Sequence, residues 1–175
     1  MLKIIAIAVV VLVAGVLLFA ATRPDTFQVQ RTTSIKAPPE KIFPLINTLQ
    51  SFGAWNPFAK KDPGIKESYS GPASGKGAMR TFDGNQDVGK GSLEITESSP
   101  PSRVVMQLRM TEPMQADNQI EFILEPRGDV PHVTWTMHGP VPYFAKIIHM
   151  VFNMDRMIGG DFETGLASLR SVAEK

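Results

Sequence analysis

Residues 143–175 read YFAKIIHMVFNMDRMIGGDFETGLASLRSVAEK, and their apolar positions recur at helical spacing. With an advance of about 100° per residue, these positions fall on one arc of roughly 160°. The arc holds Phe144, Ile147, Ile148, Val151, Phe152, Met154, Ile158, Phe162, Leu166, Leu169 and Val172. We therefore expect one long amphipathic helix from Tyr143 to Lys175, and its stripe needs a large apolar surface to lie against.

Three residues inside this stripe do not suit a core helix. Gly159 and Gly160 each cost about 1 kcal/mol relative to Ala, and would let the backbone flex or let a ligand approach. Asp155 has two interpretations. If the helix breaks near Asn153, Asp155 caps its second part. If the helix is continuous, Asp155 is a buried carboxylate with a raised pKa, which holds the polar end of a ligand or acts as an acid or base.

The residues before this helix alternate between apolar and polar, as strands do. Residues 27–35 predict a first strand. Two short helices should follow, the first with Pro38 and Pro39 in its first turn and the second at residues 49–52. Residues 55–58, Trp-Asn-Pro-Phe, predict a rigid loop at an edge of the core.

Six further strands are expected at residues 65–70, 78–83, 92–98, 103–110, 116–125 and 132–139, separated by Gly and Pro turns. Short connections imply an antiparallel meander. The sequence thus predicts an α+β fold, in which a curved antiparallel seven-stranded sheet wraps around the C-terminal helix.

The N-terminal segment predicts a membrane anchor. From Ile4 to Ala21 the chain has 18 residues without a charged or polar side chain, and a helix of that length spans about 27 Å, close to the thickness of a bilayer core. A cleaved signal peptide is the alternative, but its apolar region is usually shorter, and Leu18 and Phe19 disfavour cleavage after Ala20 or Ala21. We expect residues 1–23 to form a single-pass anchor with its flank and residues 24–175 to form one domain. The short basic N-tail places that domain on the extracytoplasmic (periplasmic) side.

Composition excludes some classes of function. Apart from Lys3, the chain carries 17 basic and 17 acidic side chains, so no bulk charge draws it to nucleic acid. Residues 84–90 match the start of a phosphate-binding loop, but Gly91 replaces the Ser or Thr and a strand follows, so a hairpin turn is expected. His132, His138 and His149 have no carboxylate or Cys at ligand spacing, so neither a metal nor a cofactor is expected.

Several segments, in this order along the chain, resemble the START-like SRPBCC superfamily, and its polyketide cyclase/dehydrase branch in particular. They are residues 35–43 (IKAPPEKIF), 55–58 (WNPF), 133–137 (VTWTM) and 161–169 (DFETGLASL). The resemblance covers Phe27 to the C-terminus. It implies a helix-grip fold with an apolar cavity between sheet and helix, but no common catalytic motif, because members of the superfamily include lipid carriers, cyclases, hormone receptors and chaperone activators.

We expect the cavity to be adaptable, because Met106, Met110, Met137 and Met154 face it. The predicted binding residues are Trp55, Phe58, Met106, Leu108, Phe122, Trp135, Met137, Phe144, Ile148, Asp155 and Phe162, with the turns at Gly71 to Gly77 and Gly84 to Gly91 as a flexible rim.

The leading hypothesis for function is a membrane-anchored module that holds a lipid or other small apolar ligand. One alternative is a cyclase/dehydratase-type enzyme that uses Asp155, Arg80 or Tyr69, although the sequence carries no catalytic motif. The other alternative is a protein-interaction domain with a filled core.

Overall fold

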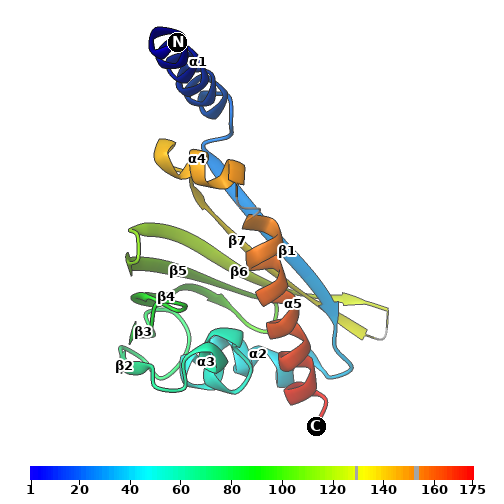
Figure 1. Ribbon diagram of the computed structural model, residues 1–175. Coiled ribbons are helices and arrows are strands. Elements are labelled where there is room, and N and C mark those ends of the chain that lie inside the picture. The colour runs from blue at the N-terminus through cyan, green and yellow to red at the C-terminus, as the bar shows by residue number, and fades with distance from the viewer. Residues whose placement is uncertain (129, 152–153) are drawn as a thin grey trace.

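The computed structural model describes residues 1–128, 130–151 and 154–175. Its centre is one curved antiparallel sheet of seven strands in the order β1-β7-β6-β5-β4-β3-β2 (Figure 1). The strands are β1 (Thr26–Ser34), β2 (Lys66–Ser70), β3 (Met79–Asp83), β4 (Lys90–Ser99), β5 (Arg103–Glu112), β6 (Ala116–Arg127) and β7 (Val130–Pro140). The predicted α+β, helix-grip architecture is confirmed.

Alternation of side chains explains how the sheet acquires a core face. Buried and more exposed positions alternate along β4, β6 and β7, because successive side chains of a strand point to opposite faces. The register places Phe122 of β6 opposite Trp135 of β7. Apolar side chains therefore gather on the face that the helices cover.

Three short helices follow β1, namely α2 (Pro39–Asn47), the 3-10 helix η1 (Leu49–Ala54) and α3 (Pro57–Lys61). The expected loop at residues 55–58 is therefore wrong in part, since Pro57 begins α3. Asn56 caps this helix, because its Oδ1 accepts from the amide of Phe58 at 3.0 Å. Trp55 is fully buried and donates its Nε1–H to the carbonyl of Leu45 at 2.9 Å.

Where the sequence predicts a continuous or a broken C-terminal helix, the structure describes two helical segments, α4 (Tyr143–Val151) and α5 (Met154–Ala173). Only α5 lies along the sheet, and α4 lies at the end nearest to the N-terminal helix (Figure 1). Residues 152 and 153 and the side chains of His149 and Met154 are outside the described residues. The expected helix break near Asn153 and the expected direction of the Met154 side chain concern these residues, so both stay predictions.

Helix α5 is packed against the sheet through a cluster of buried aromatic rings. Phe162 of α5 stacks on Trp135 with 4.0 Å between ring centroids, and Trp135 lies 5.7 Å from Trp55. A Cβ atom at Gly165 of α5 would lie 2.8 Å from the ring of Trp135. Phe162 and Gly165 of α5 therefore lie in close contact with the sheet.

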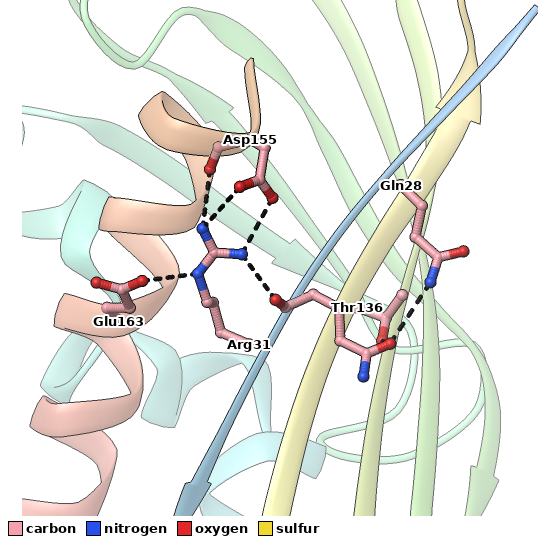
Figure 2. A network of polar contacts seen from close by, with 6 residues as sticks. Gln28, Arg31, Thr136, Asp155 and Glu163 are labelled. Carbon is pink, nitrogen blue, oxygen red and sulfur yellow. Dashed lines mark hydrogen bonds and ion pairs between the residues drawn. The ribbon is translucent and has the colours of Figure 1, made fainter. Parts of the chain in front are cut away.

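An ion-pair network fastens the first turns of α5 to β1. Arg31 pairs in register with Trp135, so its side chain points to the face that α5 covers. Its Nη1 lies 3.0 Å from Asp155 Oδ1 and its Nε lies 2.7 Å from Glu163 Oε1 (Figure 2). The hydrogen bond from Arg31 lowers the pKa of Asp155.

The interpretation of Asp155 as a desolvated carboxylate in mid-helix is therefore wrong. Asp155 lies in the first turn of α5. Its side chain is 60% exposed, and its pKa shifts opposite to the expected direction.

Gly159 makes room for this network, and its neighbour Gly160 provides a matched control. A Cβ atom at Gly159 would lie 2.0 Å from Arg31 Nη2, whereas a Cβ at Gly160 would meet nothing within 4 Å. We expect Gly160→Ala to raise the free energy of unfolding by about 1 kcal/mol, the usual gain in a helix. Gly159→Ala should lose this gain, because Arg31 must leave Asp155 and Glu163.

Thermal unfolding of both variants checks this prediction. Equal stabilisation by the two substitutions would show that Arg31 can leave its partners without cost.

Candidate ligand-binding cavity

The main candidate site is an apolar cavity of about 150 Å³ between the sheet and the segment formed by η1 and α3. We call it the Arg80 cavity. It is lined by Phe52, Asn56, Phe58, Arg80, Phe82, Val88, Leu93, Leu108, Met110, Ile120 and Trp135. These residues come from η1, α3, the strands β3 to β7 and the turn before β4, and all but Asn56 and Arg80 have largely apolar side chains. A dry apolar cavity of about this size can hold a benzene-sized molecule.

One charged side chain, that of Arg80 on β3, lies in the lining. Arg80 is only 5% exposed, and its Nη2 donates to Glu67 Oε1 on the neighbouring strand β2. Glu67 also accepts from the hydroxyl of Tyr69. Partial burial, and then this hydrogen bond, raise the pKa of Tyr69 to about 12. The phenol is therefore protonated at neutral pH and donates to Glu67.

Two N–H groups of the lining residues are buried and have no hydrogen-bond partner among the described residues. They are Nε of Arg80 and Nε1 of Trp135. Buried donors are nearly always paired in folded proteins, so each unpaired donor needs an explanation. Both belong to residues that line the same cavity.

A second apolar depression of about 270 Å³ lies where α4 meets the ends of β5 to β7, and we call it the α4 groove. Its lining includes Met137, Phe144, Ile158 and residues 113–115. Phe144 is 69% exposed and Met114 is 54% exposed. Met110 belongs to the lining of both the groove and the Arg80 cavity, so the two spaces are neighbours.

The α4 groove lies close to the N-terminal helix α1 (Leu2–Ala21). Tyr143 of α4 donates its hydroxyl to the carbonyl of Leu17 at 2.5 Å. Lys146 is 6% exposed and donates to the carbonyl of Arg23 at 2.9 Å and to Asp25 Oδ1 at 2.5 Å. These contacts hold α4 at the end of α1 that enters the domain (Figure 1).

The structure divides the predicted binding residues into four groups. Phe58, Leu108 and Trp135 line the Arg80 cavity, and Met137 and Phe144 line the α4 groove. Ile148 is half-buried in α4 and lines neither space, and Asp155 is paired with Arg31 outside both. The remaining four belong to the buried core and line neither of these two spaces: Trp55, Met106, Phe122 and Phe162.

The cavity also includes residues that the sequence-based list lacks. Met110 was expected to face the cavity and does line it, and Arg80 was expected only as a catalytic group. The sequence did not point to Phe52, Asn56, Phe82, Val88, Leu93 and Ile120. The sequence does carry a signal for Arg80, because Ala78, just before β3, and Arg80 and Phe82 of β3 alternate with more exposed residues and are all buried. Of the two predicted glycine-rich rims, residues 84–91 contribute Val88 to the lining, and residues 71–77 contribute none of the lining described here.

The described residues include no group of three His, Cys, Asp or Glu side chains that could hold a metal ion.

The sequence matches the model of a known protein family. Residues 26–174 match the model of the family described as polyketide cyclase / dehydrase and lipid transport. No curated protein matches the chain.

Several solved structures are similar in fold. Protein CV1439 from Chromobacterium violaceum has 16% identity and a TM-score of 0.59, over 87% of this chain and 99% of that chain. The Aha1 dimer from Colwellia psychrerythraea has 23% identity and a TM-score of 0.58, over 85% and 96%. Ginseng major latex-like protein 151 from Panax ginseng has 12% identity and a TM-score of 0.59, over 87% and 100%.

Proposed function

We propose that this chain, which belongs to the polyketide cyclase / dehydrase and lipid transport family, is a membrane-tethered module that binds a small apolar ligand. The observation that carries the proposal is the Arg80 cavity, an apolar space of about 150 Å³ inside the helix-grip domain. Largely apolar pockets with a few placed polar groups are typical of small-molecule sites.

The chemistry of the lining favours binding over acid–base catalysis. Arg80 is the one titratable residue in the described lining of the cavity, and an arginine does not exchange protons at neutral pH. Tyr69 has a raised pKa and donates its hydroxyl hydrogen to Glu67, and Asp155 lies outside the cavity. A pure interaction domain would have a filled core, and the space beside Leu108 and Ile120 argues against this alternative.

The tether is helix α1, of which residues Lys3–Ala21 are long and apolar enough to cross a membrane, with a mean hydropathy of 3.2 over their most apolar 18-residue window. A signal sequence near the N-terminus has the same properties. The contact of Tyr143 with Leu17 favours a retained helix, because tyrosine is enriched at the membrane–water interface. The side of the membrane that the domain occupies stays a prediction.

The α4 groove supports a route from the bilayer to the cavity. Phe144 and Met114 are exposed in this groove, and α4, which carries Phe144, contacts the end of the proposed anchor. Exposed apolar side chains near a membrane can enter the headgroup region. Met110 lines both the groove and the Arg80 cavity, and its unbranched side chain can adapt to a molecule that passes from one to the other.

The proposal is tested with ethylbenzene as the probe and the full chain in phosphatidylcholine nanodiscs. Methyl NMR of Leu108, Met110 and Ile120 reports on the cavity itself, independently of probe dissolved in lipid. We expect these methyl signals to shift and saturate with the probe, while those of core residues such as Val104 stay in place. Unmoved methyl signals of Leu108 and Ile120 would refute a binding cavity.

A further inference from the structure

Two unpaired donors of residues that line the Arg80 cavity bear on the chemistry of its ligand. Nε of Arg80 and Nε1 of Trp135 are buried donors without a partner among the described residues. Each has lost the hydrogen bonds that water gives it in the unfolded chain, and this loss is unfavourable unless another acceptor replaces them. A ligand with acceptor oxygens would give both N–H groups a hydrogen-bond partner.

The two donors are held in place by other contacts. Trp135 is 2% exposed and stacks on Phe162. The guanidinium of Arg80 lies 5.4 Å from the ring centroid of Phe82 and is paired with Glu67 on its Nη2 side. Neither side chain can turn to solvent without breaking these contacts.

Charge balance decides which acceptor fits. The positive charge of Arg80 is already compensated by Glu67, whose other oxygen accepts from Tyr69. An anionic ligand would bring a second negative charge close to Glu67 in surroundings of low dielectric, where like charges repel strongly. A carbonyl oxygen accepts the same N–H groups without adding a charge.

We propose that the ligand of the Arg80 cavity is an uncharged molecule with an apolar body and a carbonyl-type acceptor oxygen, which accepts hydrogen bonds from Arg80 Nε and Trp135 Nε1. This inference rests on the proposed function, because it names the ligand class of the same cavity.

Three probes of similar size separate the chemical classes. They are ethylbenzene without an acceptor, acetophenone with a carbonyl, and benzoate with a carboxylate. Each is titrated onto the full chain in phosphatidylcholine nanodiscs, with empty nanodiscs to correct for dissolved probe, and read from the methyl signals of Leu108 and Ile120. We expect acetophenone to bind about tenfold or more tighter than ethylbenzene, since a hydrogen bond to a charged donor gives such a factor. Benzoate should bind most weakly.

Two variants assign the preference to the named donors. Arg80→Lys keeps a positive charge for Glu67 but lacks the Nε–H group, and Trp135→Phe keeps an aromatic ring but lacks Nε1–H. In each variant the advantage of acetophenone should fall at least threefold while ethylbenzene still binds. If neither variant folds, the order of the three probes in the wild-type chain decides by itself.

The outcomes separate this inference from the proposed function. If ethylbenzene and acetophenone both fail to bind, the cavity and the inference fall together. If ethylbenzene binds and acetophenone is no tighter, the cavity stands and the inference is overturned, as it would be if ordered water satisfied both donors. Tighter binding of benzoate than of acetophenone would overturn it as well.

Discussion

Replacing Leu108 by Trp should close the Arg80 cavity to ligand and leave the domain folded, whereas the same substitution at Met106 should destabilise it. Both residues are apolar, belong to β5 and face the core, so the substitution at Met106 is a matched control for the one at Leu108. Leu108 lines a space of about 150 Å³ that an indole can enter. Met106 is fully buried in the packed core.

The expected difference follows from packing. An extra ring in filled space forces neighbours to move, at a cost of about 1–3 kcal/mol in the free energy of unfolding. Thermal unfolding of both variants in one detergent measures this cost for Met106→Trp and should find little change for Leu108→Trp. Equal losses of stability in the two variants would show that no usable space exists beside Leu108.

Removing the N-terminal helix should transfer the protein from the membrane fraction to the soluble fraction. The full chain should pellet with membranes and resist carbonate extraction, because the most apolar 18-residue window of Lys3–Ala21 has a mean hydropathy of 3.2 and only 6% of it is buried within the protein. A chain that begins at Pro24 should be soluble and folded, since the sheet and its core lie beyond α1.

Fractionation followed by N-terminal sequencing of the protein from its own host checks this prediction. A mature N-terminus near Thr22 would show that the segment is a cleaved signal peptide and that the domain is not tethered.

Strands were predictable from this sequence because their period is local. The alternation of apolar residues in β5 to β7 places Met106, Phe122 and Trp135 on one face, and Gly and Pro residues mark most of the turns. Periodicity left open whether residues 143–175 form one helix or two, because the apolar residues keep helical spacing across residues 152 and 153. A stripe shows which side of a helix is apolar, not whether the helix continues.

The site was less accessible to sequence reasoning, because it depends on contacts between distant segments. Asp155 finds its partner Arg31 on the first strand, which no local spacing reveals. Met106 and Leu108 share a face, and only the position of η1 and α3 over the sheet decides that Leu108 borders a cavity. Arg80 is the exception, since a charged residue between Ala78 and Phe82 on a buried face is visible in the sequence.

The central claim, that the Arg80 cavity holds an apolar molecule at the membrane, is tested most directly by native mass spectrometry. The full wild-type chain and its Leu108→Trp variant are released from the same host membranes and measured side by side, and organic extraction identifies any retained molecule. Our account predicts a defined adduct of a small apolar molecule on the wild-type chain and its loss from the variant. The absence of any adduct, or the same adduct on both proteins, would contradict it.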